Sequence, residues 1–120
     1  MPYDSSNIFA QIVRGTLPAK KVYEDDHVIA FHDIRPLADV HVLVIPKGAY
    51  DTMSDFAHNG TDTEITALVR AIGKVASLMS LEEHGYRVII NQGQHGGQEV
   101  AHVHAHIIGG NALGPMLSLA

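Results

Sequence analysis

The sequence contains no cysteine among its 120 residues. Disulfides, thiolate zinc sites, iron–sulfur clusters and cysteine nucleophiles are therefore excluded. We expect the nucleophile of any covalent chemistry here to be an imidazole or an oxygen. The composition is otherwise that of a folded protein, with 46% hydrophobic and 18% charged residues. This length suffices for one domain with an ordinary core, so we expect a single domain over residues 1–120.

Positive charge is also scarce. Eight Lys and Arg stand against thirteen Asp and Glu, which gives a formal net charge of −5, and the basic residues are scattered along the chain. Because nucleic-acid polymers are bound through a basic face, we expect no DNA or RNA partner. A single small phosphate compound remains possible, since backbone amides and imidazoles can hold it.

Long apolar runs are missing as well. None approaches the ~20 residues of a membrane span, and the first residues show neither the basic nor the apolar region of a secretory signal. We therefore expect a cytoplasmic protein with no membrane partner.

Hydrophobic periodicity predicts an α+β fold. A short helix is expected over residues 7–15, and a long one from the capping box at Thr61 to a stop at Gly85. No element is expected in the polar stretch before Gly60 or in the loop over residues 92–98. Five strands are predicted, at residues 21–24, 28–32, 41–45, 86–91 and 101–108. Short turns favour antiparallel pairing, with the long helix on one face of the sheet.

Histidine is abundant, with nine residues, and three alternate along the last predicted strand as His102, His104 and His106. Side chains of successive strand residues point to opposite faces, so the three imidazoles should share one face, about 6.6 Å apart. Buried imidazoles need polar partners. The pairs Gly96-Gly97 and Gly109-Gly110 flank the strand and allow an anion to approach the backbone closely.

Three interpretations of this strand stay open. A solvated face that carries three histidines by chance is improbable. A metal site would use alternate histidines with a third ligand from elsewhere, but no carboxylate shares the strand and only Glu99 is near. We favour phosphoryl chemistry, in which one neutral imidazole attacks phosphorus while others bind its oxygens and protonate the leaving group. We expect no metal ion and no required cofactor.

The segment Gly97–Gly109 contains the order His-apolar-His-apolar-His-apolar-apolar and resembles the histidine triad (HIT) superfamily. Other segments resemble its Hint branch, the histidine triad nucleotide-binding proteins, in the same order along the chain, and the last of them is more similar to bacterial members. They are residues 7–9 with 15–19, 30–36, 41–47, 85–87 with Asn91, and 113–116. The resemblance covers nearly the whole chain.

This resemblance implies a homodimer in which two five-stranded sheets join into one ten-stranded sheet. It also implies a purine nucleoside phosphoramidase, which hydrolyses AMP–amine (P–N) bonds through an adenylyl-histidine intermediate and releases AMP. Two alternatives stay open: a dinucleoside polyphosphate hydrolase, and a nucleotide-binding regulatory protein with little catalysis.

By the same resemblance, His104 would be the nucleophile and His106 would contact the phosphate and protonate the leaving group. His102 and His41 would support them. Asp33 would accept the ribose hydroxyls, with Asn91 near the ribose. The remaining nucleotide-binding positions form an apolar slot for the purine and a segment along the phosphate. The slot comprises Ile8, Phe9, Ile12, Phe31 and Ile34, and the phosphate segment comprises Gly97, Gln98 and Glu99.

Two residues depart from the family pattern. Glu99 stands where animal members carry serine, and Ala101 replaces a more usual tyrosine. Because a carboxylate would repel the phosphate, we expect the Glu99 side chain to turn outward. Of the other histidines, three are expected in solvent beside turns and helix ends, and two could line the mouth of the site. The first group is His27, His58 and His84, and the second is His32 and His95.

Overall fold

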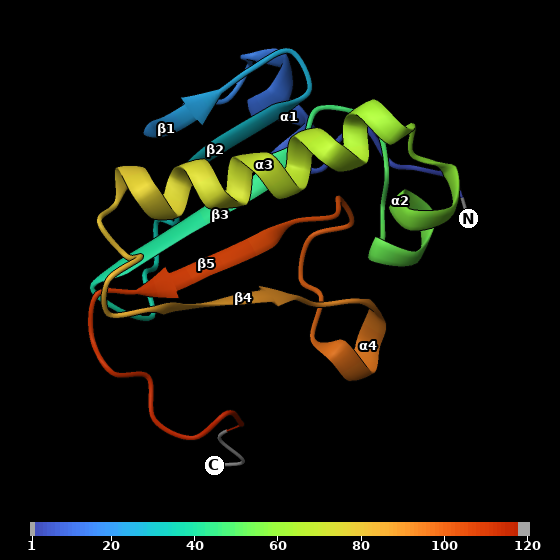
Figure 1. Cartoon of the computed structure of the whole chain (residues 1–120). Coiled ribbons are helices and arrows are strands. Elements are labelled where there is room, and N and C mark those ends of the chain that lie inside the picture. The colour runs from blue at the N-terminus through green and yellow to red at the C-terminus, as the bar shows by residue number, and fades with distance from the viewer. Residues whose placement is uncertain (1, 118–120) are drawn as a thin grey trace.

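Five antiparallel strands form one sheet in the order β1-β2-β3-β5-β4. The computed structural model describes residues 2–117, and Figure 1 shows the arrangement of their elements. The strands are β1 (Lys21–Glu24), β2 (Val28–His32), β3 (Val40–Pro46), β4 (Tyr86–Ile90) and β5 (Ala105–Gly109). The predicted α+β fold with a five-stranded antiparallel sheet is confirmed.

The two predicted helices are present and begin at the expected caps. Helix α1 (Ile8–Arg14) starts after Asn7, whose side chain accepts a hydrogen bond from the Ala10 N–H. Helix α3 (Asp62–Leu78) starts with the capping box, in which Thr61 and Glu64 each accept a hydrogen bond from the other's backbone N–H. These short-range bonds satisfy N–H groups that the helix itself leaves free.

The end of α3 differs from the prediction. Gly85 does not end the helix, because the chain already turns after Leu78. Ser80 adopts a left-handed conformation with φ 58°, and the Leu81 N–H donates to the Ala76 carbonyl at 2.9 Å. This is the hydrogen-bond pattern of a Schellman turn, which glycine usually supplies. The predicted end at Gly85 is therefore too late, because Ser80 occupies the position where glycine is usual.

Two short helices were not predicted. Helix α2 (Met53–Asn59) lies in the polar stretch, and α4 (Gly93–Gly96) lies in the loop before the histidines. Only Phe56 of α2 is buried and no residue of α4 is. With at most one apolar contact each, neither helix carries a hydrophobic period that a sequence pattern could reveal.

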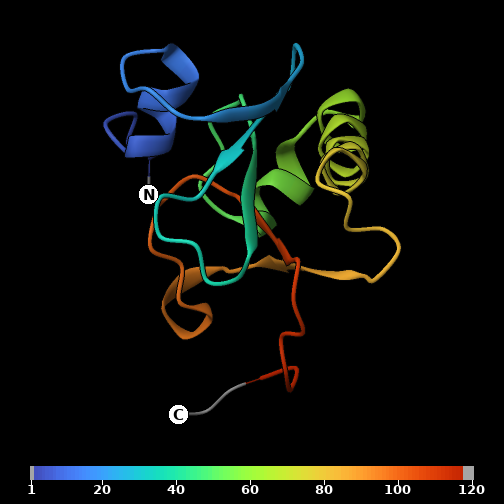
Figure 2. The same ribbon diagram turned by 90° about the vertical axis from the view of Figure 1, so that its left-hand side faces the viewer.

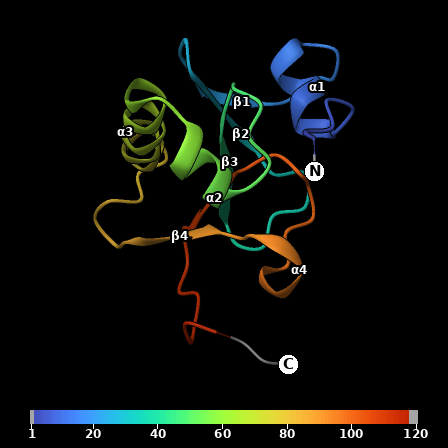
Figure 3. The same ribbon diagram turned by 90° about the vertical axis from the view of Figure 1, so that its right-hand side faces the viewer.

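The sheet separates two clusters of buried side chains. Helix α3 covers one face, where Val42, Val44 and Ile107 pack against Leu68 and Val75. Helix α1 packs on the opposite face, where Phe9 and Ile12 meet residues of β2 and β3. Viewed along the sheet, α1 and α3 lie on opposite sides, with α1 near β1 and β2, and the short helix α4 lies on the side of α1, next to β4 (Figures 2 and 3).

No helix in residues 2–117 combines the length and the apolar character that crossing a bilayer requires.

Candidate active site

The three alternating histidines lie near one another, but not on one strand. β5 begins at Ala105, so the strand predicted from residue 101 is too long at its start. The Val103 N–H donates to the Tyr50 carbonyl, at 2.9 Å, and this bond holds the preceding segment against the loop before α2 instead of in the sheet. Of the three histidines only His106 lies in the strand. The expectation that all three share one strand face is wrong.

His104 lies beside His106 with a ring-centroid distance of 5.0 Å. Its Nδ1 is 2.7 Å from the His102 carbonyl oxygen. Because a carbonyl only accepts hydrogen bonds, Nδ1 carries the proton and Nε2 keeps its lone pair. The ring is 4% exposed, and burial lowers the pKa of His104 against the opposing effects of this hydrogen bond and of Asp33 and Glu99. His104 is therefore a neutral imidazole, the form that acts as a nucleophile.

His102 uses both of its ring nitrogens inside the protein. Nε2 lies 2.7 Å from the Pro46 carbonyl oxygen and must donate to it, which leaves Nδ1 to accept from the Tyr3 hydroxyl at 2.5 Å. Only 1% of the side chain is exposed, and burial lowers the pKa of His102. With no free nitrogen, His102 supports the site and does not contact a substrate.

His41 and His106 form a hydrogen-bonded pair across β3 and β5. His106 pairs with Leu43 in the antiparallel register, so His41 is its diagonal neighbour on the same face. The Leu37 N–H donates to His41 Nδ1 at 3.1 Å, so the proton of His41 lies on Nε2. This Nε2–H donates to His106 Nδ1 at 2.9 Å. His106 must then carry its own proton on Nε2.

The outer nitrogens of His104 and His106 remain available. Neither Nε2 takes part in a hydrogen bond among the residues that the structure describes, and the same part of the chain holds no fully buried side-chain nitrogen or oxygen without a partner. Both Nε2 atoms therefore face solvent. One offers a lone pair and the other an N–H, side by side on the face of the sheet beyond α1.

The carboxylate of Asp33 adds negative charge beside the pair. Its Oδ2 is 3.5 Å from His41 Nε2, while its Oδ1 accepts from the Arg35 N–H at 2.8 Å. Burial lowers the pKa of His41, and the nearby Asp33 opposes this shift. Burial, then repulsion by His104 and His41, lowers the pKa of His106 to about 4. Both imidazoles are neutral at pH 7 when no ligand is bound.

Asp33, His41 and His106 also have the spacing of a metal site, with ligand atoms within 4.8 Å of one another. A metal ion would need lone pairs on both His41 Nε2 and His106 Nδ1. The His41 proton would then move to Nδ1, where it would face the Leu37 N–H. The hydrogen bonds thus favour a proton relay over metal coordination, and the absence of a metal remains a prediction.

The predicted purine slot contains two kinds of residue. Ile8 and Ile34 are 48% and 92% exposed, and they are free to contact a ligand. Phe9, Ile12 and Phe31 are at most 8% exposed and belong to the core on the α1 face of the sheet. Of the five, only Ile8 and Ile34 therefore present a large part of a side chain to a ligand.

The predicted phosphate segment is arranged by Gln98. Its amide donates to the carbonyls of Asp51, at 2.6 Å, and Val100, at 2.9 Å, and its Oε1 accepts from the Gly93 N–H at 3.1 Å. These contacts occupy the Gln98 side chain, which fixes the loop and leaves only its backbone for an anion. Gly97 has the left-handed φ of 74°, and the Glu99 side chain is exposed.

The remaining residues named from the sequence differ in their exposure. Asn91 is half-buried just after β4, Ala101 is exposed, and His27 is half-buried. The four other histidines outside the site are exposed, namely His32, His58, His84 and His95. Tyr3 was not predicted, because it precedes α1 and belongs to no periodic pattern.

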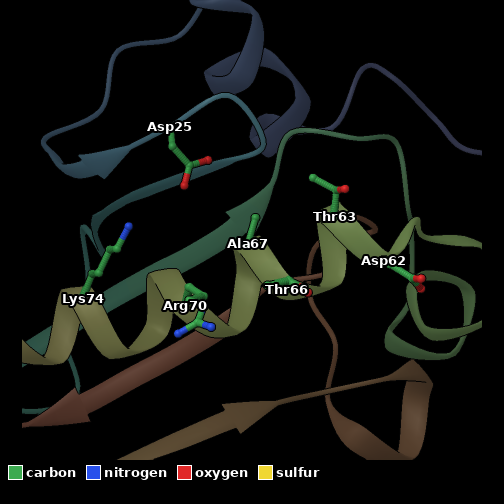
Figure 4. A pocket seen from close by; sticks show the side chains of 7 residues that line it. All are labelled: Asp25, Asp62, Thr63, Thr66, Ala67, Arg70 and Lys74. Atoms are coloured by element: carbon green, nitrogen blue, oxygen red, sulfur yellow. The ribbon is translucent and has the colours of Figure 1, made fainter.

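A separate polar groove lies on the other face, between α3 and the turn that joins β1 to β2 (Figure 4). Two of its four charged side chains are engaged, since Lys74 donates to the Tyr23 hydroxyl and Tyr23 donates to Asp25, and no histidine lines the groove. We therefore place the candidate site at the histidines and not here. The groove is lined by Asp25, Asp62, Thr63, Thr66, Ala67, Arg70 and Lys74.

The lowered histidine pKa values predict a loss of stability in mild acid. In the unfolded chain these imidazoles have a pKa near 6.5. Below that pH the unfolded state binds more protons than the folded state, so the free energy of unfolding decreases as the pH is lowered. For His106 alone, a change from 6.5 to about 4 gives a loss on the order of 2 kcal/mol at pH 5. Denaturant titrations between pH 7.5 and 5 measure the loss.

The matched controls are His106→Asn, which should lose less stability over this range, and His84→Asn, which changes an exposed histidine and should behave like the wild type. A free energy of unfolding that stays constant from pH 7.5 to pH 5 would contradict the assignment of neutral, buried imidazoles.

The comparisons with known proteins identify the family. The HIT domain family model matches residues 14–113. A 13.2 kDa HIT-like protein of Azospirillum brasilense is 51% identical over 97% of this chain and 95% of its own length. The purine nucleoside phosphoramidase of Escherichia coli is 41% identical over 92% of each chain.

The fold comparison agrees. A HIT family hydrolase from Clostridium thermocellum is 36% identical, covers 96% of this chain and 99% of its own, and superposes with a TM-score of 0.88. The resemblance of the histidine segment to the HIT superfamily is thus confirmed over most of the sequence and over the fold. The chain belongs to the histidine triad (HIT) family.

Proposed function

We propose that this HIT protein is a purine nucleoside phosphoramidase of the Hint branch, which hydrolyses the P–N bond between AMP and an amine. The observation that carries the proposal is the pair of outward Nε2 atoms, a lone pair on His104 and an N–H on His106. The likeness to a relative named purine nucleoside phosphoramidase supports the substrate class. No cofactor is required, because both reacting groups are side chains.

In the first step His104 Nε2 attacks the α-phosphorus, and the P–N bond breaks. The leaving amine nitrogen needs one proton. A bound phosphate anion opposes the effect of burial and favours the protonated form of His106, and the nearby Asp33 carboxylate acts in the same direction. His106 therefore takes up a proton on Nδ1 as the substrate binds, and the His41 Nε2–H turns from that nitrogen toward the Asp33 carboxylate, 3.5 Å away. His106 then passes its Nε2 proton to the amine. The product is an adenylyl group on His104.

In the second step water attacks the phosphorus, and the bond to His104 Nε2 breaks. His106, now neutral, accepts the proton of the water. AMP leaves, His104 returns to its neutral form, and His106 releases the proton to solvent once the phosphate anion is gone, because its pKa is again about 4. The His102 carbonyl accepts the Nδ1–H of His104 throughout, so that positive charge on the adenylated imidazole is stabilised.

The nucleotide is proposed to lie across the open end of this face. The exposed Ile8 and Ile34 side chains would hold the purine, and the carboxylate of Asp33 would accept the ribose hydroxyls. Backbone N–H groups of Gly97, Gln98 and Glu99 would meet the phosphate.

We also propose a homodimer that continues the sheet through β4. This strand lies at the edge of the sheet, and its Tyr86 and Val88 side chains are 38% and 41% exposed. An edge strand with free backbone groups and apolar side chains favours pairing with a second copy.

Incubation of the protein with an adenosine 5′-phosphoramidate should release AMP and the amine, with no metal added and no loss of rate in a chelator. The proposal fails if no AMP appears from any such substrate. Faster hydrolysis of a diadenosine polyphosphate would favour the dinucleoside polyphosphate hydrolase instead. Tight binding of AMP without any turnover would favour a regulatory protein.

A further inference from the structure

Residues 3–7, called the strap here, run from Tyr3 to the start of α1. The Asp4 side chain accepts from the backbone N–H and the hydroxyl of Ser6, at 2.9 and 2.6 Å. The carbonyl of Ser5 accepts from Arg14, at 2.7 Å. These hydrogen bonds hold the strap in one conformation and attach it to α1, independently of any contact with the histidines.

Tyr3 connects this strap to the site. Figures 2 and 3 show the start of the chain below α1, next to the segment that leads into β5. The Tyr3 hydroxyl lies 2.5 Å from His102 Nδ1, and the two rings meet edge to face at 5.7 Å. Because His102 Nε2 must donate to the Pro46 carbonyl, Nδ1 is a lone pair and Tyr3 is the donor. No other group among residues 2–117 donates to this nitrogen.

The contact leads on to the proposed nucleophile. The carbonyl oxygen of His102 accepts the Nδ1–H of His104, at 2.7 Å, and this bond alone fixes which nitrogen of His104 faces the substrate. His102 is held at one end by Pro46 and at the other by Tyr3. If the Tyr3 hydroxyl is removed, a buried acceptor loses its partner, and the His102 ring loses one of its two hydrogen bonds, while the Val103 N–H still holds the adjoining peptide to the Tyr50 carbonyl.

We propose that Tyr3 is a positioning residue for catalysis, which acts through His102 to hold His104 Nε2 in line with the phosphorus. This inference rests on the proposed function, since it concerns the nucleophile of that reaction. The competing explanation is that Tyr3 only anchors the start of the chain. The two explanations differ in the role of the hydroxyl: positioning requires its hydrogen bond to His102 for full activity, whereas anchoring of the strap alone does not.

The test compares Tyr3→Phe with Ser6→Ala in the full chain. Tyr3→Phe keeps the ring and removes only the donor to His102. Ser6→Ala removes a hydrogen bond of similar length from the same strap without touching a histidine. For both variants we would measure kcat and KM on an adenosine phosphoramidate, AMP affinity, thermal unfolding, and the ¹⁵N resonances of the imidazoles.

For Tyr3→Phe we expect kcat to fall about three- to tenfold with KM and AMP affinity unchanged, and the ring resonances of both His102 and His104 to shift. Ser6→Ala should keep kcat and the histidine resonances of the wild type. The inference is overturned if Tyr3→Phe leaves kcat and the His104 resonances unchanged, or if Ser6→Ala loses as much activity as Tyr3→Phe.

If the wild type itself releases no AMP, the proposed function fails and the resonances still decide the role of Tyr3. A shift of the His104 signals in Tyr3→Phe alone would then support positioning, and unchanged signals would overturn it.

Discussion

Replacement of His104 by alanine is expected to reduce phosphoramidate turnover by on the order of 10⁴-fold or more, while AMP still binds. The effect is large because one particular nitrogen, His104 Nε2, supplies the attacking lone pair. In the free protein His104 Nε2 is the lone pair that faces solvent, because its Nδ1–H is committed to the His102 carbonyl. No neighbour can replace it, since the Nε2 of His106 is protonated and His102 has no free nitrogen.

The assay is steady-state release of AMP together with AMP affinity, measured on the same preparation. A rapid quench of the wild type should trap an acid-labile adenylyl group, and the variant should trap none. His104→Asn provides a polar second variant in case alanine destabilises the buried position, and the exposed His84→Ala should behave like the wild type. A fully active His104→Ala protein would disprove the assigned nucleophile.

Replacement of His106 by glutamine is expected to slow cleavage of an alkylamine from AMP by about 10²- to 10⁴-fold, the usual contribution of a general acid. The loss should depend on the leaving group. An alkylamine must be protonated as it leaves, whereas p-nitrophenolate leaves as an anion. With the p-nitrophenyl ester of AMP, the same variant should lose roughly tenfold or less.

Comparing the two substrates separates acid catalysis from general damage to the site. A variant that merely misplaces the phosphate would slow both reactions by the same factor, and that result would contradict the role given to His106. His41→Gln is an informative companion. It breaks the relay to His106 Nδ1 without removing the donor itself, so its loss should be smaller than that of His106→Gln on the amine substrate.

The sheet and its main helix follow from local chemistry that a sequence displays. The apolar run of β3 and the capping box at Thr61 carry their information within a few residues. The elements that were missed carry theirs elsewhere. Helix α2 is stabilised by a cap and one buried phenylalanine, Phe56, and α3 ends on Ser80, where a backbone pattern replaces the usual glycine.

The same division holds within the site. The alternation of the three histidines indicated that they would lie near one another, and the resemblance to the HIT superfamily added His41 to them. The sequence could not indicate their protonation pattern, because it is set by the Leu37 N–H, by main-chain carbonyls and by Tyr3, which is 99 residues away from His102. The length of β5 was misjudged for a similar reason, since the Tyr50 carbonyl draws Val103 out of the sheet.

The loop between β2 and β3 contributes a main-chain group to the histidine pair and a separate side chain to the proposed purine site. At Leu37 it supplies a main-chain N–H to the relay, and at Ile34 it presents a side chain that is 92% exposed. Because every residue except proline would supply this N–H at position 37, side chains along this loop can be exchanged while the protons of the paired imidazoles stay where they are. If the proposed reaction is the true one, the fold therefore offers a route to new base or leaving-group preferences that preserves its chemistry.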